Sequence, residues 1–194
     1  MTTRMILIGG LPGSGKTYFG ARIANRAGMF LDKDVVTHDF TAALLGKLGC
    51  PPGDRESPEY IYKVRPLEYR AMLAVAIKNL EVGHSVICSA PFVNEFHDTG
   101  WVQRTEIEAE RYGAECHFVW VNSDEDTLHQ RLRHRGERRD EWKLNHWDLW
   151  YHSVPKSPPK ITGLVVLNNQ AHTNPSVQQQ IMTFLAKLNI EVES

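Results

Sequence analysis

Residues 10 to 17 have the spacing G-x-x-x-x-G-K-T, which is typical of a loop that holds phosphate groups. Glycines let the backbone N–H groups of such a loop turn toward an anion, and a helix begins with its positive end at the same point. Lys16 is placed to bridge the β- and γ-phosphates of ATP, and the Thr17 hydroxyl to bind Mg²⁺. The residues expected to contact the nucleotide are Gly10, Leu11, Pro12, Gly13, Ser14, Gly15, Lys16, Thr17 and Tyr18.

Two carboxylates flank a lysine in Leu31-Asp32-Lys33-Asp34, at the end of a short apolar run. We expect Asp34 to be catalytic, because a carboxylate there can accept the proton of a hydroxyl that attacks the γ-phosphate. Asp32 or Asp34 can also hold a metal-bound water. In the alternative, Asp34 only caps the helix that follows.

Five arginines lie within the nine residues 131 to 139. Arg131 and Arg135 are four residues apart, on one face of a helix, and we expect both to be catalytic. So much fixed positive charge in one cleft is relieved when a triphosphate arrives. Gly136 would let the segment beyond it close as a lid, which we place at about residues 131–152. The alternative is a solvated basic face paired with Glu137, Asp140 and Glu141.

Two groups of aromatic residues are weaker candidates for binding the acceptor. Tyr62, Arg65 and Tyr69 share a helical face if Pro66 does not break the segment, and packing or exposure explains them equally well. The second group is Trp142, Trp147, Trp150 and Tyr151. Stacking on a base or sugar is one interpretation of this second group, and packing of the lid against the body is the favoured one.

Composition indicates one globular α/β domain spanning residues 1–194. The 22 Lys and Arg residues nearly balance the 23 Asp and Glu residues, so the overall charge does not favour nucleic acid or a membrane as a partner. The three cysteines have neither zinc-binding nor disulfide spacing, which favours a reducing cytoplasm. No apolar run reaches 18 residues, so no membrane span is expected.

Apolar runs alternate with helical periods along the chain, which predicts βαβ units and a parallel sheet. Strands are expected at Met5–Gly9, Met29–Asp32, Ser85–Ser89, Glu115–Val121 and Ile161–Leu167. Helices are expected at Lys16–Ala27, at Val35–Leu48, from Pro66 to near Gly83, at Trp101–Tyr112, after Ser123–Asp126, and from Pro175 onward. Ligands of such sheets bind beyond the carboxyl ends of the strands, where the phosphate loop and Asp34 lie.

The chain resembles the small P-loop kinases, in the branch with polynucleotide 5′-kinases, gluconate-type kinases, chloramphenicol phosphotransferase and zeta-type toxin kinases. The resemblance rests on G-L-P-G-S-G-K-T at 10–17, L-D-K-D at 31–34 and R-L-R-H-R-G-E-R-R-D at 131–140. It implies a three-layer P-loop NTPase fold with a five-stranded parallel sheet in the order 2-3-1-4-5 and an arginine-rich lid. It further implies that Asp34 activates the acceptor, that Arg138 joins Arg131 and Arg135 at the nucleotide, and that residues 168–172 lie beside the adenine.

One departure from that family concerns the metal. Many members carry an aspartate or an Asp-x-Asn element where this chain has Ser89-Ala-Pro91.

Taken together, these motifs predict an ATP- and Mg²⁺-dependent kinase that phosphorylates a hydroxyl of a small molecule. A polynucleotide 5′-hydroxyl kinase, a nucleotide-hydrolysing switch and a toxin-like kinase are the alternatives, and the oligomeric state is not indicated.

Overall fold

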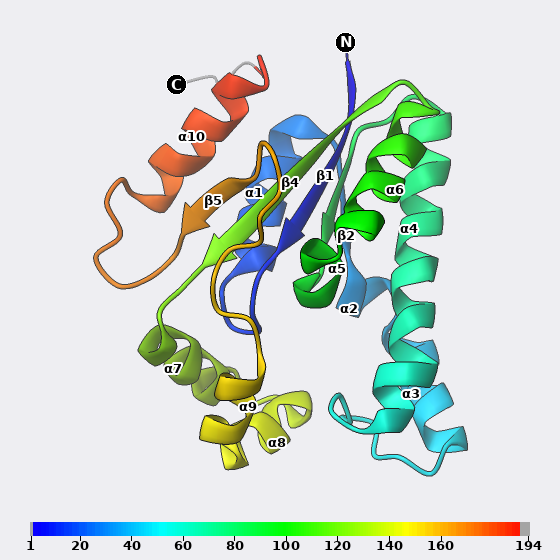
Figure 1. Ribbon diagram of the computed structural model, residues 1–194, viewed down its shortest axis with the longest axis vertical. Helices are drawn as coiled ribbons and strands as arrows, with labels where there is room; N and C mark the ends of the chain where they lie inside the picture. Colours follow the sequence, from blue (N-terminus) through cyan, green and yellow to red (C-terminus); the bar gives the residue numbers. More distant parts are fainter. Residues whose placement is uncertain (1, 191–194) are drawn as a thin grey trace.

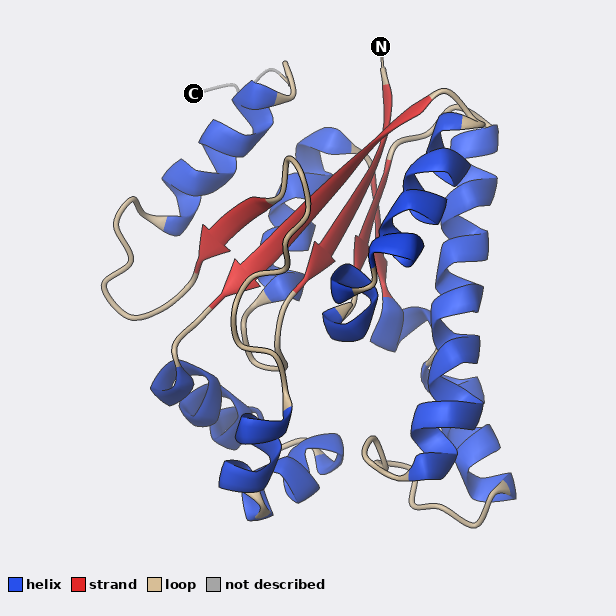
Figure 2. Ribbon diagram, viewed as in Figure 1, coloured by secondary structure: helices blue, strands red, loops and turns tan. Residues whose placement is uncertain are grey.

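The computed structural model describes residues 2–190. Its centre is a five-stranded sheet in the order β2-β3-β1-β4-β5, with all neighbouring strands parallel (Figures 1 and 2). The strands are β1 (Thr3–Gly9), β2 (Met29–Asp32), β3 (Val86–Ser89), β4 (Ala114–Asn122) and β5 (Val165–Asn168). The predicted strand number, direction and order are confirmed.

The side chains of β1 point alternately into two halves of the core, one on each face of the sheet. Met5 and Leu7 pack on one side of the sheet, while Ile6 and Ile8 pack on the other, because successive side chains of a strand point to opposite faces. The first side is covered by α4 (Arg65–Glu81), α5 (Val93–His97) and α6 (Thr99–Glu110), and the second by α1 (Lys16–Ala27) and α10 (Val177–Lys187) (Figure 1). Three layers result, with both faces of the sheet buried.

The remaining helices gather beyond the carboxyl ends of the strands (Figure 1). One group follows β2 and consists of α2 (Lys33–Val36), α3 (His38–Lys47) and the short helix η1 (Tyr60–Val64). The other follows β4 and consists of α7 (Glu125–Arg135), η2 (Arg138–Asp140), α8 (Glu141–Asn145) and α9 (Trp147–Ser153). Within residues 2–190, none of the helices is long and apolar enough to cross a membrane.

The single helix expected at Val35–Leu48 is wrong, because the chain turns at Thr37. The Thr37 hydroxyl donates to the carbonyl oxygen of Lys33 over 2.7 Å, and the Thr37 backbone leaves the helical region at φ −114°. This bond closes α2 after one turn, since a threonine side chain competes for helical carbonyls. The chain then starts α3 in a new direction.

Several other boundaries differ from the prediction by one or more residues, and two of these differences have a clear local cause. The fifth strand begins at Val165 instead of Ile161, because residues 161–164 form a turn in which Leu164 N donates to Ile161 O over 3.1 Å. The last helix begins at Val177 instead of Pro175. There Ser176 and Gln179 form a capping box, in which each side chain accepts from the other's backbone N–H.

Candidate active site

The phosphate loop joins β1 to α1, and its glycines are required by its shape. Gly10 has φ +146° and Gly15 has φ +95°. A Cβ would lie 2.5 Å from Val121 O at Gly10 and 2.2 Å from Asn169 Nδ2 at Gly15, so a side chain is excluded at both positions. No side chain among residues 2–190 caps the N-terminus of α1. Its first N–H groups are therefore available to an anion.

Lys16 and Thr17 open α1 at the edge of the cavity. Lys16 Nζ donates to Leu11 O over 2.9 Å, which folds the lysine back along the loop. Burial lowers the pKa of Lys16 to about 8, although the nearby carboxylate of Asp34 opposes the shift. The Thr17 hydroxyl donates to Asp32 Oδ2 over 2.7 Å.

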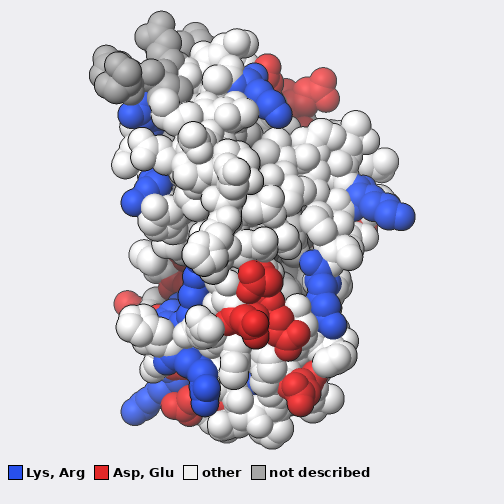
Figure 3. Space-filling view, turned by 90° about the vertical axis from the view of Figure 1, so that its left-hand side faces the viewer, with Lys and Arg blue, Asp and Glu red and all other residues white. Residues whose placement is uncertain are grey.

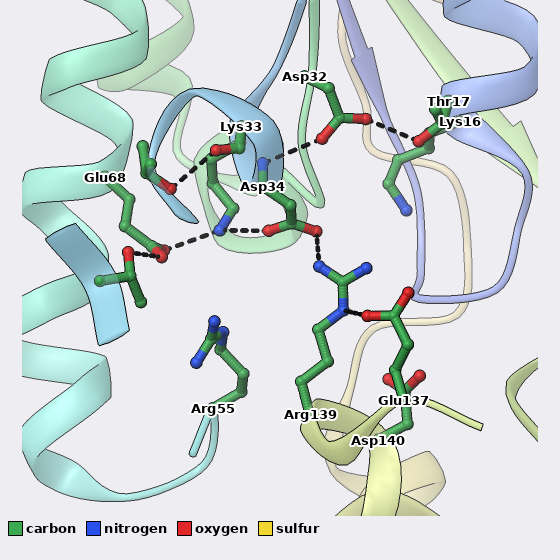
Figure 4. Close-up of polar contacts among 12 residues, drawn as sticks. Lys16, Thr17, Asp32, Lys33, Asp34, Arg55, Glu68, Glu137, Arg139 and Asp140 are labelled. Carbon is green, nitrogen blue, oxygen red and sulfur yellow. Dashed lines mark hydrogen bonds and ion pairs between the residues drawn. The ribbon is translucent and has the colours of Figure 1, made fainter. Parts of the chain in front are cut away.

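Asp32 connects the phosphate loop to α2. Its Oδ1 accepts from the backbone N–H of Asp34 over 2.9 Å and caps α2, while its Oδ2 holds Thr17. The alternative in which Asp34 caps this helix is therefore wrong. Because Asp32 does the capping, the side chain of Asp34 projects into the cavity (Figure 4).

Asp34 lies between two cations. Lys33 Nζ is 2.8 Å from Asp34 Oδ1, and Arg139 Nη1 donates to Asp34 Oδ2 (Figure 4). Burial alone would raise the pKa of Asp34. Lys33 and Arg139 overcome that effect and hold the pKa well below its usual range. The carboxylate is therefore ionised at neutral pH.

A buried polar network fixes Lys33. Lys33 and Glu68 are 2% and 1% exposed, and Lys33 Nζ donates to Glu68 Oε2 over 2.8 Å. Glu68 also accepts from the Thr41 hydroxyl over 2.7 Å and from the Tyr60 hydroxyl over 2.8 Å. Sequence reasoning missed Glu68, because it lies 35 residues from Lys33 and no local pattern joins them. The network holds the lysine in one position beside Asp34.

Arg131 approaches the phosphate loop from α7. Its guanidinium donates to Asn169 Oδ1 over 3.2 Å and lies 3.4 Å from the carbonyl oxygens of Gly13 and Ser14. Within residues 2–190 it forms no ion pair, and burial lowers its pKa. An unpaired, half-buried guanidinium beside a phosphate loop is suited to bind an anion.

The other arginines of the cluster take different positions. Arg135 lines the cavity and donates through Nε and Nη2 to the buried Asp140, over 2.8 and 2.6 Å. Arg138 is exposed and is not among the residues that line the cavity, so the structure does not bring it to the site. Arg139, for which the sequence analysis predicted no individual role within the cluster, reaches Asp34 and pairs with Glu137.

These side chains line one cavity of about 810 Å³, within the usual size range of ligand sites. Of the predicted site residues it includes Leu11, Pro12, Gly13, Gly15, Lys16, Thr17, Tyr18, Asp34, Arg131 and Arg135. Gly10 and Ser14 belong to the same loop but not to the lining. The cavity also contains residues that the sequence analysis did not single out, namely Arg55, Tyr60, Lys143, Val154 and Pro155.

The first aromatic group does not form a single acceptor-facing surface. Tyr69 is buried in the core, and its hydroxyl accepts from the N–H of Phe92. Arg65 lies 4.6 Å from the Tyr69 ring and pairs with Glu95, whereas Tyr62 is 77% exposed. Pro66 does not break the segment, since it stands in the first turn of α4.

The second aromatic group packs α9 against α7. The rings of Trp147 and Tyr151 stack with centroids 5.6 Å apart, and Trp147 Nε1 donates to Glu125 Oε1. Trp150 is buried and also lines the cavity. Packing, the favoured interpretation, accounts for most of this group.

The donor set next to the phosphate loop suits Mg²⁺. Within residues 2–190, no three His, Cys, Asp or Glu side chains are placed to hold a metal by themselves. Mg²⁺ keeps several waters and uses substrate phosphates with only one or two protein oxygens, so a hydroxyl backed by a carboxylate is sufficient. Thr17 and Asp32 provide that pair. Asp32, at the end of β2, thus places a carboxylate oxygen 2.7 Å from the Thr17 hydroxyl, in a chain that has no acidic residue directly after β3.

Fold and loop together define a P-loop protein with the fold of the small P-loop kinases. A family model described as an AAA domain (AAA_33) matches residues 5–154, and the chain belongs to that family. No curated protein sequence matches the chain significantly.

Three solved structures have a fold similar to this chain over nearly its whole length. A Chloroflexus aurantiacus protein, provisionally assigned as a kinase, has 18% identity, covers 98% of this chain and 100% of its own, and has a TM-score of 0.67. A gluconokinase from Sinorhizobium meliloti has 18% identity, covers 96% and 94%, and has a TM-score of 0.60. The Mycobacterium tuberculosis APS kinase CysC, in complex with AMPPNP and APS, has 17% identity, covers 97% and 98%, and has a TM-score of 0.60. At these identities the likeness is one of fold.

Proposed function

We propose that the protein is an ATP- and Mg²⁺-dependent kinase that transfers the γ-phosphoryl group to a hydroxyl of a small molecule. The observation that carries the proposal is the common cavity, in which unpaired cations at the phosphate loop face an ionised Asp34. The gluconokinase and APS kinase that share the fold support the kinase class. Asp34 would be needed as a general base only if a hydroxyl compound binds there to accept the phosphoryl group.

The phosphate end of the site acts by positioning and by charge. The loop N–H groups and Lys16 would hold the β- and γ-phosphates, and Arg131 and Arg135 would stabilise the charge on the transferring group. Thr17, with Asp32 behind it, would bind Mg²⁺, which neutralises charge on the phosphate oxygens. Tyr18, which lines the cavity, stays part of the proposed nucleotide site, whereas Arg138 lies outside the lining and would reach the nucleotide only through a movement of the lid.

The acceptor end depends on Asp34. A carboxylate with a lowered pKa is a weak base, so Asp34 would mainly orient the hydroxyl and receive its proton late in the transfer. This is compatible with a loose transition state, in which the nucleophile needs little activation before attack. Arg139 now occupies Asp34 Oδ2, so the acceptor hydroxyl would take over that contact.

We further propose that residues 1–194 act as one P-loop kinase-like domain with a lid at about 131–152. Gly136 has φ +62° at the end of α7, and nothing lies within 4 Å of the place of its Cβ. Such an open left-handed position allows rotation of the segment that follows. Rotation there would carry Arg139 toward or away from Asp34.

The experiment is a mass-spectrometric screen of sugars, sugar acids, nucleosides, antibiotics and 5′-hydroxyl oligonucleotides for an added phosphoryl group. With the acceptor found, Asp34→Asn should lower kcat roughly 10²- to 10⁴-fold and leave the Kd for MgATP nearly unchanged. Asp39→Asn, at an exposed site on α3, is the matched control. Normal turnover in Asp34→Asn would remove Asp34 from the mechanism. Fast ADP release without any acceptor would favour a hydrolysing switch.

A further inference from the structure

The cations that line the cavity fall into a paired and an unpaired set. Most of them have a carboxylate partner: Lys33 with Glu68, Arg65 with Glu95, Lys143 with Glu56 over 2.5 Å, Arg135 with Asp140, and Arg139 with Asp34. Among the described residues, three lining cations have no carboxylate within ion-pair distance, namely Lys16, Arg131 and Arg55. The triphosphate of the proposed nucleotide would account for the first two, which contact the phosphate loop.

Arg55 is held firmly by its own surroundings. Its Nη1 donates to the carbonyl oxygens of Asp54 and Pro52, over 2.6 and 3.2 Å, and its guanidinium lies 5.1 Å from the centre of the Tyr60 ring. Tyr60 is itself fixed by its bond to the buried Glu68. The side chain is therefore already ordered, so binding a ligand would cost little of its conformational entropy.

One edge of this guanidinium has no acceptor among the described residues of the protein. Nη1 is used by the loop carbonyls, while the buried Nε lacks a hydrogen-bond partner among residues 2–190. Nε and Nη2 lie on the same edge of a guanidinium, and this edge matches the two oxygens of a carboxylate or phosphate. Figure 4 shows Arg55 pointing from its loop toward Lys33 and Asp34, on the opposite side of Asp34 from Lys16.

We infer that Arg55 recognises an anionic group on the acceptor, so that the phosphorylated compound carries a carboxylate or phosphate as well as its hydroxyl. The inference rests on the proposed kinase function and narrows its substrate class. A partly buried guanidinium without a counter-charge is costly, and an anion from the substrate removes that cost. Held at Arg55, such an acceptor would present its hydroxyl toward Asp34.

The test uses pairs of compounds that differ in the anionic group alone. With saturating AMPPNP and Mg²⁺ occupying the phosphate loop, calorimetry measures the binding of D-gluconate against D-sorbitol, and of glucose 6-phosphate against glucose. We expect one anion to bind roughly 10- to 100-fold more tightly than its neutral partner, as expected for a charge-assisted pair. The pair that shows the preference distinguishes a carboxylate from a phosphate.

Arg55→Gln should abolish this preference and leave both AMPPNP affinity and the far-UV spectrum unchanged. Arg55→Lys should retain part of the preference for the anion, since lysine has the positive charge but not the two parallel N–H donors of a guanidinium. Arg104→Gln, an exposed arginine on α6, is the control and should keep the preference. Equal binding within both pairs, no measurable binding of either anion, or an unchanged preference in Arg55→Gln would overturn the inference.

Phosphoryl transfer is measured separately, so the two proposals can fail independently. If a neutral alcohol is phosphorylated with a KM that does not depend on Arg55, the kinase stands and the anionic acceptor is wrong. If anion binding depends on Arg55 but nothing in the screen is phosphorylated, the anion site stands and the kinase is wrong.

Discussion

Asp34 combines two demands that oppose each other. In the proposed transfer it must be ionised to accept a hydrogen bond from the attacking hydroxyl, and the two cations beside it favour the ionised form by lowering its pKa. The same cations weaken it as a base and occupy its oxygens. The fixed cation, Lys33, is buried with Glu68, whereas Arg139 belongs to the segment after Gly136, which we propose moves as a lid. In that proposal Arg139 is the contact that adjusts the site.

Removing Arg139 should move the pH dependence of activity. In Arg139→Gln, Asp34 loses one of the cations that oppose the effect of its burial, so the pKa of Asp34 rises. Because the ionised form is the active one, activity should then be lost at a higher pH on the acid side than in the unaltered protein. Profiles of kcat/KM between pH 4.5 and 8 measure the shift, and Arg133→Gln, at an exposed position of α7, is the control. Superimposable acid limbs would exclude an effect of Arg139 on Asp34.

Lys16 should make nucleotide binding sensitive to alkaline pH. Its pKa of about 8 lies below the ordinary value of 10.5, so the ammonium begins to lose its proton near pH 8 in the protein without nucleotide. Only the protonated form pairs with phosphate, so the Kd for MgAMPPNP should be constant below about pH 7 and rise above about pH 8, by at most tenfold per pH unit. Calorimetry from pH 6.5 to 9.5 measures this. Lys16→Met should bind weakly with no such rise, and a level Kd in the unaltered protein would contradict the lowered pKa.

The helix α2 depends on one residue that also belongs to the proposed metal site. Asp32 caps α2 and holds Thr17, so Asp32→Ala should lower the free energy of unfolding by about 1 kcal/mol and raise the Mg²⁺ concentration needed for half-maximal activity. Ser176→Ala removes the cap of α10, which lies against β5 on the α1 side of the sheet. The Ser176→Ala variant should lose a similar amount of free energy of unfolding and keep the Mg²⁺ requirement of the unaltered protein. Denaturant unfolding and Mg²⁺ titration of both variants separate the two roles, and equal Mg²⁺ requirements would exclude Asp32 from the metal site.

Elements that are defined by local signals could be predicted, while those defined by distant partners could not. Both α1 and β2 have the predicted bounds, because glycines and a clear hydrophobic period mark their ends. The division of the second helix depends on one hydroxyl of Thr37, which the helical period does not reveal. The same limit applies within the site. The loop and Asp34 follow from motif and position, but Glu68, Arg55 and Arg139 enter through tertiary packing.

The whole molecule has little net charge, and its strong fields are local. The sequence has a formal charge of −1, and on the face shown in Figure 3 basic and acidic side chains are interspersed. Most cations that line the cavity are likewise paired with a carboxylate. Attraction of an acceptor therefore acts over short distances inside the cavity.

This charge distribution predicts a weak dependence of activity on salt. Salt would screen part of the attraction between a small anionic acceptor and the cavity. Between 50 and 200 mM KCl, at saturating Mg²⁺, kcat/KM should therefore fall less than about fivefold. An enzyme that follows a polynucleotide backbone releases counterions at each phosphate contact and would lose about 10³-fold or more over the same range. The measurement is acceptor kinetics at constant nucleotide occupancy, with potassium acetate in place of KCl to exclude an effect of chloride. A steep loss in both salts would mean that the cavity opens onto an extended phosphate-binding surface, and the polynucleotide kinase would then replace the small-molecule kinase.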